Sequence, residues 1–103
     1  MNRRKEPRLR VEIPVRIWGV DRMARPFAEV VRVKNVSWSG AVLLGVHAKI
    51  CAGGLLDVEH GSQRAQFRIA WAGSGEAGIQ ALPFEPCIWD VALPKTIDMV
   101  GAG

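Results

Sequence analysis

The sequence lacks the features that mark secreted, disulfide-bonded or membrane-spanning proteins. It has only two cysteines, Cys51 and Cys87, which are too few for a disulfide framework, and neither stands at zinc-ligand spacing from another Cys or a His. This usage fits a reducing compartment. No apolar run approaches the roughly 20 residues of a membrane span, and no apolar segment follows the basic N-terminus as it would in a signal peptide. We therefore expect a cytoplasmic protein that does not insert into a membrane.

Recognisable catalytic patterns are missing as well. No paired carboxylates stand out, and no serine lies in a nucleophile-elbow context. His47 and His60 have no carboxylate or Cys at a spacing that suggests a metal site or a catalytic pair. Residues 73–78 match G-x-G-x-x-G, but an alternating segment and then Pro83 follow them where a dinucleotide site requires a helix. We interpret these glycines as a hairpin turn. The sequence thus predicts a binding module with no enzymatic activity, cofactor or metal.

What the chain does have is a concentration of positive charge at its start. Its 103 residues fit one domain, and the net charge is +4. Residues 1–10 are basic and show no periodicity, so we interpret them as a flexible arm. Such an arm indicates an anionic partner, which could be a nucleic acid, a nucleotide or an acidic surface, or else it is a solubilising tail. The basic residues of this region are Arg3, Arg4, Lys5, Arg8, Arg10 and Arg16.

From Val11 onward, apolar and polar residues alternate with period two in short segments separated by turn residues, which predicts an all-β sandwich or barrel over residues 11–94. Pro14 indicates an edge or a bulge. The parity of the apolar residues slips near Lys34–Asn35, which predicts a β-bulge there. Trp71 continues an inward-facing series, so we expect it in the core. The expected strands cover 11–17, 27–37, 41–45, 55–60, 63–72 and 76–82, followed by an extended piece at 88–93 and a tail at 95–103 with one helical turn.

Two short motifs flank the start of this β region. Arg4-Lys-Glu-Pro-Arg8 has the spacing R-x-x-x-R and is preceded by Arg3, just before the first expected strand. Asn35-Val-Ser37-Trp-Ser-Gly40 has the spacing N-x-S-x-x-G, where the second expected strand turns into the third. Either motif alone occurs by chance, since the second could be an ordinary Asx-turn at a strand end. Their order and context carry the information.

With these two motifs the chain resembles the PilZ family, whose members carry R-x-x-x-R in an N-terminal arm and D/N-x-S-x-x-G at the start of the barrel. The resemblance implies a six-stranded antiparallel β-barrel that binds the bacterial second messenger cyclic di-GMP and transmits its level to a downstream protein partner. It implies a site formed by Arg3, Arg4, Arg8, Asn35, Ser37 and Gly40. An arginine at the position of Arg3 further implies two stacked ligands per chain. The likeness also covers residues 8–18, Gly40-Ala-Val-Leu-Leu, FRIAWAG with EAGIQAL, and CIWDVALP.

The chemistry of these residue types suits such a ligand. An arginine can donate two hydrogen bonds to guanine O6 and N7, grip a phosphate, or stack on a purine. Four residues of extended arm span ~13 Å, enough to flank one ligand. Asn35 and Ser37 supply polar groups on the barrel, and we expect Gly40 to adopt a positive φ and leave room for the ligand. We therefore expect the arm to fold over the ligand against the barrel.

Two other functions fit the same sequence. A small barrel with a basic arm could bind single-stranded RNA or DNA by stacking bases on tryptophans. Alternatively, a PilZ-like barrel could serve only for protein contacts, with both motifs inert. The tryptophans available for stacking are Trp18, Trp38, Trp71 and Trp89.

Overall fold

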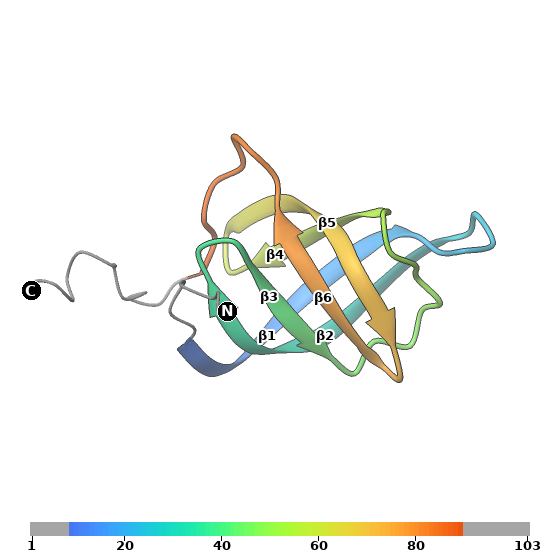
Figure 1. Cartoon of the computed structure of the whole chain (residues 1–103), viewed down its shortest axis with the longest axis horizontal. Coiled ribbons are helices and arrows are strands. Elements are labelled where there is room, and N and C mark those ends of the chain that lie inside the picture. The colour runs from blue at the N-terminus through green and yellow to red at the C-terminus, as the bar shows by residue number, and fades with distance from the viewer. Residues whose placement is uncertain (1–8, 90–103) are drawn as a thin grey trace, which may run out of the picture.

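Six antiparallel strands close into a barrel in the computed structural model, which describes residues 9–89 (Figure 1). The order around the barrel is β1-β2-β3-β6-β5-β4, and β4 pairs with β1 to complete the circle. This confirms the predicted fold class. Residues 1–8 of the predicted arm, the end of the extended piece and the tail lie outside the described residues. The strands are β1 (Leu9–Val20), β2 (Pro26–Ser37), β3 (Gly40–Leu44), β4 (Leu55–His60), β5 (Gln63–Gly73) and β6 (Glu76–Ala81).

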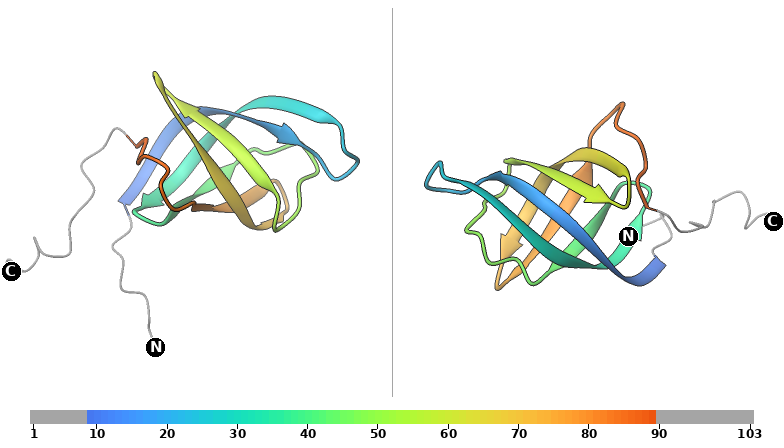
Figure 2. Two further views of the ribbon diagram at one scale, coloured as in Figure 1. Left: turned by 90° about the horizontal axis from the view of Figure 1, so that it is seen from above. Right: turned by 180° about the vertical axis from the view of Figure 1, so that it is seen from behind.

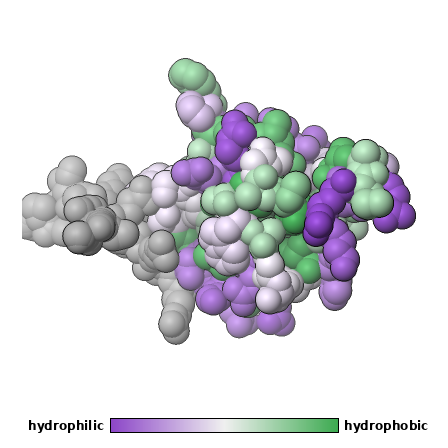
Figure 3. Space-filling model, turned by 45° about the vertical axis from the view of Figure 1, so that its right-hand side comes forward, coloured by the Kyte–Doolittle hydropathy of each residue, from purple (hydrophilic) through white to green (hydrophobic). Residues whose placement is uncertain are grey.

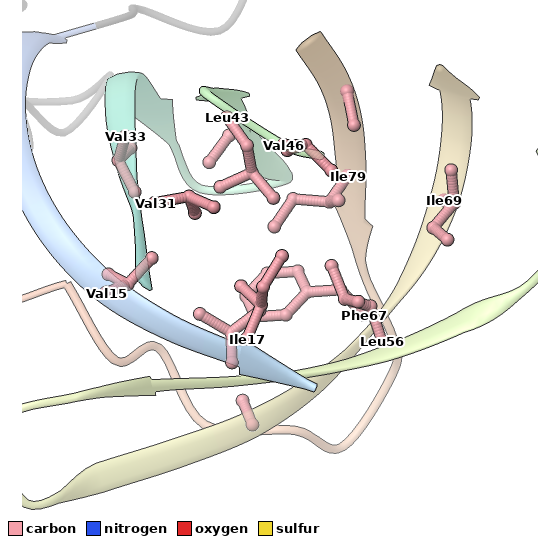
Figure 4. Close-up of a cluster of buried hydrophobic side chains, with 14 of the residues drawn as sticks. Val15, Ile17, Val31, Val33, Leu43, Val46, Leu56, Phe67, Ile69 and Ile79 are labelled. Atoms are coloured by element: carbon pink, nitrogen blue, oxygen red, sulfur yellow. The ribbon is translucent and has the colours of Figure 1, made fainter. Parts of the chain in front are cut away.

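Alternation along each strand sends every second side chain into the barrel, where they form one apolar core. Figure 4 shows side chains from all six strands meeting in the interior. Ile17, Leu43 and Val58 are fully buried there. The core residues on the strands are Val15, Ile17, Val31, Val33, Val36, Ala41, Leu43, Leu56, Val58, Ala65, Phe67, Ile69, Ala77 and Ile79.

The irregularities of β1 and β2 agree with their sequences. The pairing of β2 with β3 shifts register between Val33 and Asn35, which brings Val36 into the core and confirms the predicted bulge. Pro14 pairs with Arg32 of β2, whereas the pairing of β1 with β4 begins only at Arg16. Pro14 therefore lies where β1 has one strand neighbour within the described residues, a position that tolerates the missing N–H donor.

The glycine-rich segment after β5 forms a two-residue hairpin turn. Ser74 and Gly75 have φ angles of 54° and 78°, and Gly73 pairs with Glu76 across the turn. Two consecutive positive φ angles are the geometry of the type I′ turn that joins twisted strands. The interpretation of this segment as a turn is confirmed.

The segment after β6 closes one end of the barrel. Ile88 and Trp89 are buried, and the Trp89 ring centroid lies 5.8 Å from that of Phe67. His60 Nδ1 lies 2.9 Å from the carbonyl oxygen of Ile88, which ties the segment to the end of β4. The views in Figure 2 place this orange segment at the same end of the barrel as the start of β1 and the β2–β3 turn. Residues 9–89 contain no helix, and hence none of the length and apolarity needed to cross a membrane.

Candidate ligand-binding site

The three barrel residues of the predicted site lie together on the outer wall formed by β2, β3, β6 and β5. Asn35 pairs with Val42, and Ser37 pairs with Gly40, across the β2–β3 hairpin. These two rows of paired residues continue across the sheet onto β6, because Val42 pairs with Gly78 and Gly40 pairs with Gln80. On β5 the first row ends at Trp71, which pairs with Gly78. The pairing of β3 with β6 and of β6 with β5 thus brings residues from the second half of the chain next to the β2–β3 hairpin.

These rows border a hollow with a volume of about 150 Å³. Its lining combines small residues with hydrogen-bonding groups, so the backbone is accessible to a flat ligand. No lining residue carries a charge. The residues that line it are Asn35, Ser37, Ser39, Gly40, Ala41, Val42, Ala70, Trp71, Gly78, Ile79 and Gln80.

Ser37 supplies a buried hydroxyl to this hollow. It is buried, and its Oγ lies 3.4 Å from the Oγ of Ser39, with either atom able to donate. Asn35 is half-buried one row away. A buried polar side chain is costly unless it is hydrogen-bonded, which is a reason for Ser37 to keep partners in this position.

Gly40 is required here for a different reason from the one expected. Its φ is not among the positive values of the described residues, so the predicted left-handed conformation is wrong. Instead, β3 approaches β6 so closely that a Cβ on Gly40 would overlap the carbonyl oxygen of Ile79. The amide of Ala81 donates to the carbonyl oxygen of Ser39 at 2.7 Å and holds the β2–β3 turn against the end of β6. Gly40 permits this close packing.

Trp71 belongs to this surface and not to the core, which corrects the expectation from its sequence parity. The pairing of β5 with β6 shifts register between Ile69 and Trp71, so the series that points inward at Ile69 points outward at Trp71. The Trp71 side chain is 46% exposed, and its indole lies directly over Gly78, where a Cβ would overlap it. The glycine opposite a tryptophan is the sequence signal that could have revealed this arrangement. Gln80 also lines the hollow and was not predicted from the sequence to belong to the site.

The chain enters the barrel beside this hollow directly after the arginine motif. β1 begins at Leu9, directly after Arg8, and its first residues pair with the second motif: Leu9 with Val36 and Arg10 with Asn35. Arg3, Arg4 and Arg8 themselves lie outside the described residues. On the face drawn in Figure 3, pale and green residues gather in the middle, and hydrophilic residues lie around them at the upper, lower and right-hand edges.

The arrangement offers groups that could bind a ligand. The wall offers neutral hydrogen-bonding groups at Asn35, Ser37 and Gln80 and an aromatic face at Trp71. Residues 9–89 contain no group of three or more His, Cys, Asp or Glu that could hold a metal ion. No protein-family model matches this chain, and no curated protein does so either.

Proposed function

We propose that this chain is a PilZ-type receptor module that binds cyclic di-GMP on the outer wall of β2, β3, β6 and β5. The observation that carries the proposal is the pairing of Arg10 with Asn35. It brings the chain that follows R-x-x-x-R alongside N-x-S-x-x-G, although 26 residues separate Arg8 from Asn35 in the sequence. The segment that directly follows the first motif thus lies beside the second motif, which supports a shared site for the two.

The ligand's chemistry divides between the two motifs. Cyclic di-GMP carries two guanines and two anionic phosphates. The hollow has no charged lining residue, so its amide, hydroxyl and indole groups suit the bases. The phosphates and the guanine O6 and N7 acceptors require positively charged groups with paired hydrogen-bond donors, and the guanidinium groups of Arg4 and Arg8 supply these from the arm. Neither part would bind such a dianion well alone.

This division leads to a mechanism of arm closure. The arm folds over the ligand against the barrel, and charge-assisted hydrogen bonds offset the entropy lost on ordering it. The ordered arm then presents a new surface to a downstream protein partner. The barrel serves as a stable platform, since its core does not depend on the ligand.

Cyclic di-GMP should bind with a micromolar or lower Kd and in clear preference to GTP, because two guanines held together gain over one by effective concentration. Isothermal titration calorimetry with cyclic di-GMP, GTP and a short single-stranded oligonucleotide checks this, and the same titration should give two ligands per chain if Arg3 stacks on a second ligand. Equal affinity for GTP contradicts the proposal. Preference for the oligonucleotide, with strong salt dependence, supports a nucleic-acid barrel instead, and no binding of any of the three supports a protein-contact module.

Trp71→Ala should weaken the binding of cyclic di-GMP by about 1–3 kcal/mol, the usual effect of removing one base-stacking aromatic. Because the indole is 46% exposed, the melting temperature of the free protein should fall less than it would for a fully buried aromatic residue. Trp71→Phe is the matched control, since it keeps an aromatic face over Gly78 and should retain most of the affinity. Calorimetry with the three proteins makes the comparison. Equal affinity of the alanine variant and the parent would remove Trp71 from the site.

A further inference from the structure

The loop after β6 displays one aromatic side chain entirely to solvent. Phe84 has a relative exposure of 103%, the highest of the large apolar residues that the structure describes. It lies in the turn Leu82–Glu85, in which the amide of Glu85 donates to the carbonyl oxygen of Leu82 at 3.2 Å. A single exposed apolar residue is common on protein surfaces, so the argument for a binding role at Phe84 rests on its backbone, its anchoring and a matching apolar hollow.

The backbone at Phe84 is also unfavourable for its residue type. Its φ is 73°, a left-handed conformation that favours glycine and is rare for an aromatic residue. Pro83 is the second residue of this turn and Phe84 is the third, the position with positive φ where type II turns usually carry glycine. Backbone strain of this kind tends to occur at functional positions.

Contacts on both sides hold the turn in place. The Glu85 carboxylate accepts a hydrogen bond at 2.8 Å from the amide of Gln66 on β5. On the C-terminal side, Ile88 and Trp89 are buried in the barrel end. Phe84 is thus presented by an anchored loop, which reduces the entropy lost when it is buried in an interface.

An apolar hollow of about 490 Å³ lies on the outer wall near β1 and the start of β2. Trp18, Pro26, Phe27 and Ala28 form its apolar lining, with Arg16, Glu59 and Arg64 around them. The Arg64 guanidinium carbon lies 4.6 Å from the Trp18 ring centroid and covers part of that ring. The hollow is large enough for a phenylalanine ring, and its rim has an excess of positive charge.

The hollow and the loop belong to the same side of the barrel. Trp18 pairs with Asp57 of β4, and Asp57 pairs with Gln66 of β5, whose amide binds Glu85. Adjacent strands lie about 4.8 Å apart, so Trp18 and Gln66 are separated by only about 10 Å. Because Phe84 and the hollow lie on one side, two copies related by a two-fold axis could each insert Phe84 into the hollow of the other.

We propose that this chain forms a two-fold dimer in which Phe84 of each copy occupies the hollow at Trp18 of the other. Glu85, which follows Phe84 in the loop, then approaches Arg16 and Arg64 at the rim of the hollow, so the two surfaces are complementary in charge. Exposed Val30, which pairs with Arg16 on the same wall, adds apolar area beside the hollow. The dimer leaves the β2–β3–β6–β5 wall free.

Sedimentation velocity of the full chain at increasing concentrations tests the proposal. The parent should shift from monomer to dimer. Phe84→Gly should raise the dimer dissociation constant by about a hundredfold or more, since the dimer contains two copies of an aromatic anchor. Ala28→Trp, which fills the hollow from an exposed position, should do the same. Circular dichroism should show both variants folded, with Phe84→Gly melting higher than the parent because glycine relieves the positive φ.

Mixing the two variants adds a test of reciprocity. Ala28→Trp retains its Phe84, and Phe84→Gly retains its hollow, so a mixed dimer keeps one of the two contacts. The mixture should therefore dimerise at concentrations where either variant alone is monomeric. A parent that stays monomeric at every concentration overturns the proposal. So does a parental dimer that persists unchanged in both variants, or a mixture that behaves as its separate components.

Discussion

Gly40→Val is expected to lower the free energy of unfolding by about 3 kcal/mol. A Cβ at this position would overlap the backbone carbonyl oxygen of Ile79, which cannot turn aside as a flexible side chain could. Relief would require β3 to move from β6, yet these strands pair from Gly40 to Leu44. For a domain of about this size the loss corresponds to a fall in Tm of roughly 12–24 °C. Thermal and urea melts of the free protein measure it.

Two further variants isolate the cause. Gly73→Val is the matched control, because Gly73 also lies in a strand, has no positive φ, and has no atom within 4 Å of a built Cβ. It should unfold almost as the parent does. Gly40→Ala should already be destabilising, since the overlap concerns Cβ itself. Equal losses for Gly40→Val and Gly73→Val would mean that close packing against Ile79 is not the reason for glycine at position 40.

Local patterns in the sequence were enough to predict most of the barrel. Alternation is a property of each strand by itself, so the six strands could be located without knowing their neighbours. The bulge in β2 was also predictable, because two apolar residues, Val33 and Val36, stand at spacings that a regular strand cannot bury on one face. The extended strand β1 begins at Leu9, two residues before the alternation becomes clear.

Trp71 and Gly40 were misinterpreted because their environments are set by other strands. The bulge that turns Trp71 outward exists only relative to β6, and tryptophan is apolar enough to fit either side of a barrel wall. Gly40 meets Ile79 only because β3 and β6 become neighbours when the barrel closes. Asn35, Ser37 and Gly40 could be grouped from the sequence because they belong to one hairpin, whereas Trp71 and Gln80 come from strands more than 30 positions away.

The uncharged lining of the hollow makes the arm's role testable separately from that of the barrel. Arg8→Ala should weaken the binding of cyclic di-GMP by about 1–3 kcal/mol, the value of one bidentate arginine–guanine pair. The Tm of the free protein should stay almost unchanged, as for most substitutions outside a packed core. Ser37→Ala should lose about 1 kcal/mol in binding. It should also lose some stability, because its buried hydroxyl contacts Ser39.

Calorimetry with ligand and thermal melts without it complete this comparison. Arg25→Ala is the control for the loss of one positive charge, since Arg25 lies in the β1–β2 loop, 73% exposed and 3.8 Å from the Asp21 carboxylate. It should bind cyclic di-GMP like the parent. If Arg8→Ala unfolds the free protein, the arm is part of the fold and closure over a ligand is wrong. If Arg8→Ala and Ser37→Ala both bind like the parent, the two motifs do not form the site, and the resemblance to PilZ domains does not extend to their ligand.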